Sequence, residues 1–443
     1  MRRHEPFRYH NSVELLKKAQ ELGVSLPFQE SIAPLFAAFH IGDQKVANRI
    51  AVQPMEGFDG TPAGAPGELT WRRYRRYSEG GSGLIWFEAC SVSDPGRSNP
   101  RQLTLTGKTR TEYLRLVEMA RNTARKRFGA SHEPYLVLQL THSGRFSRRE
   151  NRSKPKVTCY NPFLDKSRGE VELFRDAELV EIGDQFIAAA ILAHQAGFNA
   201  VDIKACHGYL LHELLSAFTR TDSLYGGGFE GRTRLLLDIV RRIREAVPRL
   251  DLAVRLNATD GIPYPYGFGV DQGAEAKPDL AEPLRLQQLL IDAGCVLFNI
   301  TASVPALSPH IGRPFERPAR GAKCPDIHPL SSVCSLIQLA AVFQDAHPSL
   351  PVVGTGYSWL RRFWPNVGAA VIAQGGASFI GLGRSSFAYP DAAVDLMNLG
   401  KLDPAKCCIT CSCCTDLMRN NQVAGCVIRD RTIYKGAYAN IKK

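Results

Sequence analysis

Short apolar runs rich in β-branched residues recur along the chain, and longer stretches with an apolar position every third or fourth residue separate them. A short apolar run bounded by turn residues is typical of a buried strand, whereas the longer period is typical of an amphipathic helix. The runs predict strands at about Arg49–Gln53, Gly83–Glu88, Tyr135–Leu140, Asn199–Lys204, Asp251–Leu256, Cys295–Ile300, Pro351–Thr355 and Ser378–Leu382.

The longer stretches between these strands predict helices. They cover Thr109–Arg127, Ala177–Ala196, Phe229–Val247, Leu280–Ala293 and Ser332–Ala346. Alternation of strand and helix predicts a parallel sheet. Eight such units over roughly 350 residues favour a closed (β/α)₈ barrel over an open doubly wound sheet.

The chain divides into three parts. We expect an N-terminal helical extension over residues 1–30, a barrel over residues 31–400 and a cysteine-rich tail over residues 401–443. The extension contains a helix at Ser12–Leu22, because Asn11 and Glu14 have capping-box spacing and Gly23 follows the helix. A long loop rich in Pro and Gly, Thr301–Pro329, follows the sixth strand, and such loops often cover active sites.

The composition is that of a globular protein, with 44% hydrophobic and 22% charged residues. No stretch approaches the ~20 consecutive apolar residues of a membrane span. The N-terminus also lacks the apolar segment of a secretory signal. We therefore expect a cytoplasmic protein without a membrane partner, and a homo-oligomer is compatible with this composition.

The chain is basic, with 55 Lys and Arg residues against 43 Asp and Glu residues and a formal net charge of +12. Such a charge attracts anionic molecules. The arginines cluster on expected helices at Arg72–Arg76, Arg241–Arg244 and Arg361–Arg362, without a basic arm or a stacking motif. They predict a solvated basic surface and no nucleic-acid partner. A nucleic-acid-binding module is the rival hypothesis, which salt-dependent binding of an oligonucleotide would support.

Ionisable side chains stand at the carboxyl ends of the predicted strands, where barrels carry their active sites. The fourth strand leads into Lys204, His207 and Tyr209, and Gly208 permits a turn between them. Three such groups at one strand end indicate a catalytic site. The fifth strand carries Arg255 inside an apolar run, and a charge there needs a partner such as an anionic ligand.

Glycine-rich turns follow the last two predicted strands. Gly354 and Gly356 follow the seventh strand, and Gly381, Gly383 and Arg384 follow the eighth. Backbone amides freed by glycine, together with an arginine, form a phosphate cradle, and barrels often place one after these two strands. The turns therefore predict a site for a phosphate group.

A set of motifs occurs in order between about residues 30 and 390. They are Asn48–Met55, Gln139–Arg145, His207–Ser216, Arg220–Asp222, Tyr225–Gly227, Phe229–Arg234 and Gly381–Arg384. Together they resemble the signature of the old yellow enzyme family, also called the NADH:flavin oxidoreductase family. The resemblance implies an FMN-dependent barrel.

The resemblance also implies which positions hold the cofactor. Pro54, Met55 and Ala89 would lie along the flavin, and Gln139 would hydrogen-bond its pyrimidine edge. Arg255 would stabilise the negative charge that reduction places near flavin N1 and O2. The FMN phosphate would be held by Gly356, Gly383 and Arg384.

On the substrate side, the resemblance implies that Lys204 and His207 bind a substrate oxygen and that Tyr209 donates the proton. Two residues depart from the family pattern. The family commonly has His at the position of Lys204, and small or neutral residues at the position of Glu56. A buried lysine can polarise a carbonyl or anchor an anion, and a carboxylate beside the flavin can pair with a cation or act as a base.

The tail is the second candidate site. Six of the 12 cysteines lie in the last 37 residues, which in a cytoplasmic protein indicates metal ligation before disulfides. The candidate ligands, in the pattern C-x₂-C-x₂-C-x₁₁-C, are Cys408, Cys411, Cys414 and Cys426. This spacing suits a [4Fe–4S] cluster. Zinc and a site without metal are alternatives, and Cys407 or Cys413 could replace a neighbour.

The tail resembles that of an iron–sulfur subgroup of the same family, the 2,4-dienoyl-CoA reductases and trimethylamine dehydrogenases. In that subgroup the cluster exchanges electrons with FMN, and further C-terminal domains bind nucleotides. This chain has no strand followed by a G-x-G-x-x-G turn and an acidic residue. We therefore expect an external electron carrier as its partner.

The sequence thus predicts an FMN-dependent oxidoreductase that transfers hydride between flavin N5 and a small organic substrate. It would reduce an activated C=C bond or dehydrogenate an alcohol or amine, and electrons would pass through the [4Fe–4S] cluster. One alternative is a cluster-free ene reductase supplied by NAD(P)H. Another is a non-flavin phosphate-binding barrel, such as an aldolase that forms a Schiff base on Lys204.

Overall fold

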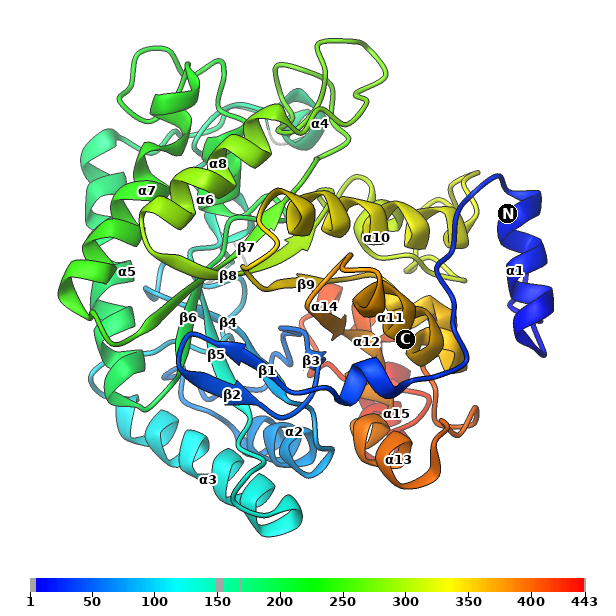
Figure 1. The fold of residues 1–443 in the computed structure, drawn as a ribbon. Helices are drawn as coiled ribbons and strands as arrows, with labels where there is room; N and C mark the ends of the chain where they lie inside the picture. Colours follow the sequence, from blue (N-terminus) through cyan, green and yellow to red (C-terminus); the bar gives the residue numbers. More distant parts are fainter. Residues whose placement is uncertain (1–4, 149–154, 168, 442–443) are drawn as a thin grey trace.

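The computed structural model describes residues 5–148, 155–167 and 169–441, and its centre is a closed barrel of parallel strands (Figure 1). The strands follow one another around the barrel in chain order, and β10 closes it against β3. This confirms the predicted (β/α)₈ barrel. The strands are β3 (Ile50–Val52), β4 (Leu84–Ser91), β5 (Tyr135–Thr141), β6 (Ala200–Ile203), β7 (Asp251–Asn257), β8 (Cys295–Thr301), β9 (Val352–Gly354) and β10 (Phe379–Leu382).

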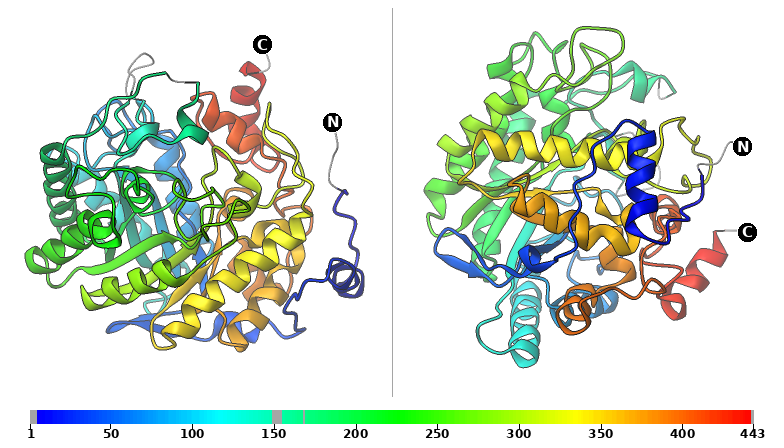
Figure 2. Two further views of the ribbon diagram at one scale, coloured as in Figure 1. Left: turned by 90° about the horizontal axis from the view of Figure 1, so that it is seen from above. Right: turned by 45° about the vertical axis from the view of Figure 1, so that its right-hand side comes forward.

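Helices cover the outside of the strands (Figures 1 and 2). The longer ones are α2 (Glu68–Glu79), α3 (Arg110–Phe128), α5 (Asp176–Gln195), α7 (Phe229–Ala246), α8 (Ala281–Asp292), α10 (Pro329–Ala346) and α11 (Trp364–Ala373). The shorter ones are α4 (Pro162–Asp165), α6 (Leu210–Leu215), α9 (Pro309–Gly312), α12 (Arg384–Ala388), α13 (Ala392–Leu399) and the 3₁₀ turns η1 (Ala33–Phe36), η2 (Gly144–Phe146) and η3 (Tyr357–Phe363). The five predicted barrel helices are confirmed to within a few residues. Each described helix falls short of a bilayer span in length or in apolar character.

A short antiparallel hairpin precedes the barrel, and the apolar pattern did not predict it. It consists of β1 (Phe39–Ile41) and β2 (Gln44–Val46), joined by a two-residue turn in which Gly42 has φ +54°. The hairpin packs against Trp86 and Tyr135 inside the barrel, beside the first residues of the strands. Strands of three residues are too short to show a period of two, and the Gly-Asp turn was the available signal.

The N-terminal helix forms as its cap predicts. α1 (Ser12–Glu21) begins after Asn11, whose side-chain oxygen accepts a hydrogen bond of 2.9 Å from the Glu14 backbone N–H. Leu15 packs into the same apolar cluster as Trp359. Figure 2 shows α1 at the side of the barrel, near α10 and α11.

The cysteine-rich tail folds onto the barrel through α14 (Cys413–Arg419) and α15 (Arg431–Asn440), drawn in red in Figure 2. A small apolar cluster of tail residues packs against Leu69 of α2. The backbone N–H of Ala424 also donates a hydrogen bond of 2.7 Å to the carbonyl oxygen of Gly57. The tail is therefore fixed to the segment that connects β3 to α2.

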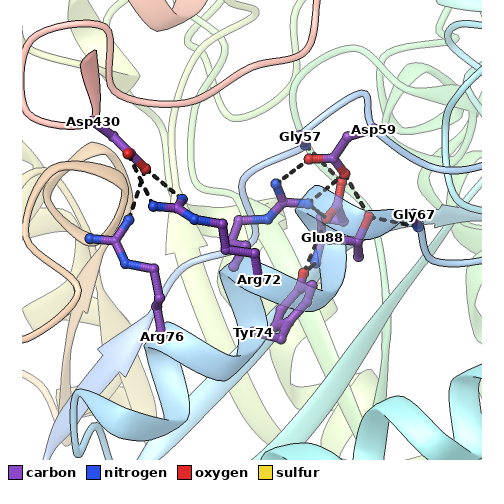
Figure 3. Close-up of polar contacts among 10 residues, drawn as sticks. Gly57, Asp59, Gly67, Arg72, Tyr74, Arg76, Glu88 and Asp430 are labelled. Carbon is purple, nitrogen blue, oxygen red and sulfur yellow. Dashed lines mark hydrogen bonds and ion pairs between the residues drawn. The ribbon is translucent and has the colours of Figure 1, made fainter. Parts of the chain in front are cut away.

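Of the four arginines of α2, Arg73 is buried, so the prediction of a solvated basic surface is wrong for it, whereas Arg72 and Arg76 are partly exposed and form ion pairs. Arg72 and Arg76 both bind the carboxylate of Asp430 in the tail, at 2.6 Å and 2.8 Å (Figure 3). Arg75 is the exposed arginine of this helix. The charges that looked like a surface patch therefore attach the tail to the barrel.

Arg73 is buried and neutralises two buried carboxylates (Figure 3). Its guanidinium donates to Asp59 at 2.5 Å and 2.8 Å and to Glu88 at 2.5 Å. Glu88 also accepts a hydrogen bond of 2.7 Å from the backbone N–H of Gly57. Burial raises the pKa of Glu88 to about 7, and the Arg73 charge opposes this shift. This network connects β4 to the segment that leads into α2.

We predict that Arg73→Met lowers the free energy of unfolding by about 3–5 kcal/mol, because Asp59 and Glu88 stay buried without their cation. The matched change Arg75→Met, on the exposed face of the same helix, should alter it by less than about 0.5 kcal/mol. Urea unfolding followed by circular dichroism compares the two variants. Equal destabilisation by both would contradict the role of Arg73.

Candidate active site

A cavity of about 380 Å³ lies at the carboxyl ends of the barrel strands. It brings together side chains from the ends of most strands and from the tail. The sequence-predicted residues that line it are Pro54, Met55, Gln139, Lys204, His207, Tyr209, Arg255, Gly356, Gly383 and Arg384. The catalytic and cofactor positions expected from separate motifs therefore converge on one site.

Ala89 is the predicted cofactor residue that does not line this cavity. It is buried in β4, and its carbonyl oxygen accepts a hydrogen bond of 3.3 Å from Nε2 of Gln102. The same Gln102 nitrogen donates to Oε1 of Glu56, at 2.7 Å, and Glu56 does line the cavity. Ala89 thus supports the wall through Gln102, a residue that the sequence analysis did not identify.

Arg384 and Arg255 each present an unpaired nitrogen atom at the cavity. Nη2 of Arg384 donates to the carbonyl oxygen of Pro314 at 2.5 Å, while its Nη1 has no partner. Nε of Arg255 is also without a partner, and burial lowers the pKa of this side chain. In the described chain neither guanidinium has a carboxylate at ion-pair distance. Because an uncompensated buried charge is costly, these arginines favour an anionic occupant.

The glycine turns bring backbone up to the same end of the cavity. Gly356 has φ +100°, which a residue with a side chain rarely adopts. At Gly381 an added Cβ would lie 2.0 Å from Nε2 of Gln53, so no larger residue fits. Close backbone approach, together with the free Nη1 of Arg384, fits the phosphate of FMN. The residues present are therefore compatible with the cofactor that the resemblance implies.

Asp202 fixes the orientation of Gln139. It accepts hydrogen bonds from Nε2 of Gln139 at 2.6 Å, from Nε1 of Trp86 at 2.8 Å and from the backbone N–H of Arg255 at 2.6 Å. Burial raises the pKa of Asp202 to about 6, and these donors oppose the shift. Since the amide nitrogen of Gln139 is held by Asp202, its carbonyl oxygen remains as the acceptor for a cofactor N–H.

Lys204 and Tyr209 pack directly against each other. Nζ of Lys204 lies 3.4 Å from the centroid of the Tyr209 ring, a cation–π contact. Lys204 is only 5% exposed, and within the described ranges its ammonium forms no ion pair. Burial lowers the pKa of Lys204 and raises that of Tyr209 well above its usual value. Tyr209 therefore carries its proton at neutral pH and can donate it.

His207 lies in the tight turn that connects β6 to α6. It has φ +64° and is followed by Gly208 with φ +79°. Its Nε2 lies 3.1 Å from the hydroxyl of Thr301, and its Nδ1 lies 3.6 Å from Sγ of Cys206. Burial, with nearby cations, lowers the pKa of His207 well below its usual value. The ring is therefore neutral at neutral pH.

The tail and the long loop after β8 supply cavity residues that the sequence analysis missed. They are Arg313, Thr415, Met418, Arg419 and Asn421. A guanidinium nitrogen of Arg313 donates to the hydroxyl of Thr415, which joins the loop to α14. The predicted coverage of an active site by this loop agrees with its position, but no motif marked Arg313 itself.

A second, smaller cavity of about 20 Å³ lies in the tail. The four candidate metal ligands line it: Cys408, Cys411, Cys414 and Cys426. Backbone N–H groups of Thr410 and Arg429 donate to the sulfurs of Cys408, at 3.4 Å, and Cys426, at 3.3 Å. Four thiols around one cavity are the donor set of an iron–sulfur cluster, and N–H donors tune such sulfurs. Arg384 lines this cavity as well as the larger one.

The neighbouring cysteines are placed differently. Sγ of Cys407 donates to the carbonyl oxygen of Asp403 at 3.5 Å, and Cys407 packs in another apolar cluster, away from the cavity. Sγ of Cys413 lies at the cavity but donates to the carbonyl oxygen of Cys411 at 3.8 Å. Among the residues that the structure describes, no three His, Cys, Asp or Glu side chains converge on a single ion. The cluster therefore stays a prediction.

Comparison with known proteins agrees with the resemblance. A sequence model of the NADH:flavin oxidoreductase / NADH oxidase family matches residues 34–272. The NADH oxidase of Thermoanaerobacter brockii is 26% identical over 420 residues, which cover 92% of this chain and 58% of that protein. The NADPH dehydrogenase of Clostridium acetobutylicum is 32% identical over 240 residues, which cover 53% of this chain and 66% of that protein. The chain thus spans less than two thirds of each relative.

The fold also has close counterparts among solved structures. A 2-naphthoyl-CoA reductase, in complex with 2-naphthoyl-CoA, superimposes with a TM-score of 0.70 at 18% identity. The match covers 92% of this chain and 58% of the reductase. At this identity the likeness shows that the two proteins share a fold.

We predict that Arg384→Ala weakens FMN binding by about 10- to 100-fold, because a charged hydrogen bond contributes roughly 1.5–3 kcal/mol. An exposed arginine of α7 serves as the control, as Arg234→Ala. Fluorescence titration of the apoprotein with FMN measures both constants, and circular dichroism checks that the barrel is intact. An Arg384→Ala protein that binds FMN as tightly as the parent would contradict the phosphate assignment.

Proposed function

The chain belongs to the NADH:flavin oxidoreductase / NADH oxidase family, and we propose that it is an FMN-dependent oxidoreductase acting on a small organic substrate in the 380 Å³ cavity. The observation that carries this proposal is the unpaired nitrogen atom that Arg255 and Arg384 each present at that cavity. Their separate positions, in β7 and after β10, suit a ligand with an anionic tail and a ring that becomes negative on reduction.

The proposed cofactor contacts follow from the geometry of the cavity. Arg384, with the glycine turns, would hold the phosphate. Gln139 would accept a hydrogen bond from the ring, since Asp202 holds its amide nitrogen. Arg255 would stabilise negative charge on the ring. Met55 and Pro54 would support the ring from the β3 side of the cavity.

FMN would supply the hydride-transfer chemistry at N5. Lys204 would hold and polarise a substrate oxygen with its ammonium, and such a donor can lower the barrier by roughly 3 kcal/mol. His207 is the second proposed oxygen contact, and it would exchange its hydrogen bond to Thr301 for one to substrate. Tyr209 would give its proton to the substrate carbon in a reduction, or accept it in a dehydrogenation.

We further propose that the tail holds a [4Fe–4S] cluster on Cys408, Cys411, Cys414 and Cys426. The shared cavity and the N–H···S hydrogen bonds support this ligand set. A cluster there would be separated from the FMN site by Arg384, which borders both cavities. Such a cluster would exchange electrons with FMN and with an external carrier. The names of the relatives suggest NAD(P)H as an electron donor.

We predict that Tyr209→Phe slows flavin reoxidation by an activated enone, such as 2-cyclohexenone, by about 100-fold, because proton donation is lost. FMN binding should stay unchanged, since Tyr209 contacts none of the proposed phosphate residues. Stopped-flow absorbance of the reduced protein measures the rate. A rate equal to that of the parent would remove Tyr209 from the proton-transfer role.

We predict about four iron and four sulfide per chain after anaerobic purification. Cys407 and Cys408 provide a matched pair of variants, because Cys408 lines the cysteine cavity and Cys407 does not. Cys408→Ser should lose the iron, whereas Cys407→Ser should retain it. Iron and sulfide analysis with absorbance spectroscopy tests this. A cluster that is absent from the parent protein, or lost equally in both variants, would contradict the ligand set.

A further inference from the structure

The cavity contains two cations on neighbouring strands, of which Lys204 is buried and Arg255 is partly buried. Arg255 is in β7, and Lys204 directly follows β6. Two cations in one apolar site repel each other, and each nearby carboxylate lowers that cost. Asp202 is committed to other donors, because its oxygens accept from Gln139, Trp86 and the Arg255 backbone. A second carboxylate at the cavity therefore lowers the cost of a charged Lys204 further.

Glu56 is the carboxyl group that lines the same cavity as Lys204. It is 7% exposed and is held in place by Gln102, whose Nε2 donates to its Oε1 at 2.7 Å. The orientation of the Gln102 amide is itself fixed, because its Oε1 accepts a hydrogen bond of 2.6 Å from the backbone N–H of Ser98. Glu56 is thus a positioned group on the wall.

The electrostatics of the cavity agree with a coupled pair. Burial lowers the pKa of Lys204, and the charge of Arg255 lowers it further. Among the groups that raise this pKa, Glu56 has the largest effect, ahead of Cys206 and Asp202. Burial likewise raises the pKa of Glu56, and Lys204 and Gln102 lower it. Each group therefore favours the charged form of the other.

We propose that Glu56 is a positioning residue for catalysis: held by Gln102 on the cavity wall, it keeps Lys204 protonated, so that the lysine meets the substrate oxygen as a cation. The pair has no net charge when both groups are ionised, which permits a cation to stay in a buried site beside Arg255. An ammonium stabilises negative charge developing on a substrate oxygen, and a neutral amine does so far less.

The significance for catalysis rests on the proposed function, in which Lys204 binds the substrate oxygen. The charge state of Lys204 can be tested without turnover. Cyanate carbamylates only the neutral form of an amine, so the rate of modification against pH reports the pKa of the lysine. The experiment uses the FMN-loaded protein, and mass spectrometry quantifies the peptide that contains Lys204. The exposed Lys45 provides an internal reference for reagent concentration.

We expect Glu56→Gln to move the carbamylation profile of Lys204 to lower pH by at least about one unit, because the loss of a carboxylate charge from the same cavity is worth more than about 1.4 kcal/mol. At a fixed pH below the transition, Lys204 should then react about tenfold faster than in the parent. Glu56→Asp retains the charge and should restore most of the parent profile. The exposed control on α5, Glu181→Gln, should leave the profile unchanged.

Three results would overturn the proposal. The first is a carbamylation profile of Lys204 in Glu56→Gln that coincides with that of the parent, and the second is a profile in Glu56→Asp that shifts as far as in Glu56→Gln. The third is no modification of Lys204 in any of the proteins up to about pH 10.5. The last result counts because a cavity that admits a substrate also admits cyanate. Failure here would leave the oxidoreductase function intact, since flavin reduction is measured separately. Conversely, an absence of substrate turnover would not alter the carbamylation result, because the modification needs no hydride transfer.

Discussion

The structure depends on one electrostatic constraint: buried and partly buried cationic side chains lie at the carboxyl rim of the barrel without carboxylates bound to them. Lys204, Arg255 and Arg384 face one cavity, and in the described chain none has an ion-pair partner. Burying a charge in this way costs several kcal/mol unless something compensates it. In the proposed function a bound anion with a ring that gains electrons would compensate the charges of Arg255 and Arg384, and the carboxylate of Glu56 would compensate that of Lys204.

The tail is part of the active-site wall, because several contacts integrate it with the barrel. Asp430 binds Arg72 and Arg76, and the N–H of Ala424 binds Gly57, one residue after Glu56. Residues of α14 line the same cavity as the barrel residues. Loss of tail structure would therefore disturb the segment that carries Met55 and Glu56 as well as the cysteine site. This physical connection is independent of whether the cysteines bind a cluster.

Much of this architecture could be predicted from the sequence, because the signals are local. Short apolar runs that alternate with helical stretches predicted the barrel, and strand-end motifs predicted residues that do converge on one cavity. The misses have physical reasons. The hairpin is too short for a period, and the burial of Arg73 depends on Asp59 and Glu88, which are far enough along the chain to leave no local pattern.

Other features needed three-dimensional contacts. Spacing alone did not separate Cys407 from Cys408, although the structure puts only the latter at the cysteine cavity. Arg313 lies in a long loop that contains no recognisable motif. Asp202 lies within a predicted strand, and the apolar pattern of that strand gives no role for its carboxylate. Its position two residues before Lys204 places both on one face of the strand, which was the overlooked signal.

The central claim is that the rim cavity binds FMN with its phosphate at Arg384 and its ring beside Gln139 and Arg255. A crystal structure of the protein grown with FMN tests this most directly. The account predicts electron density for the phosphate at the free Nη1 of Arg384 and for the ring in front of Tyr209. Density for FMN at another place, or a rim cavity filled by side chains while FMN is in excess, would contradict it.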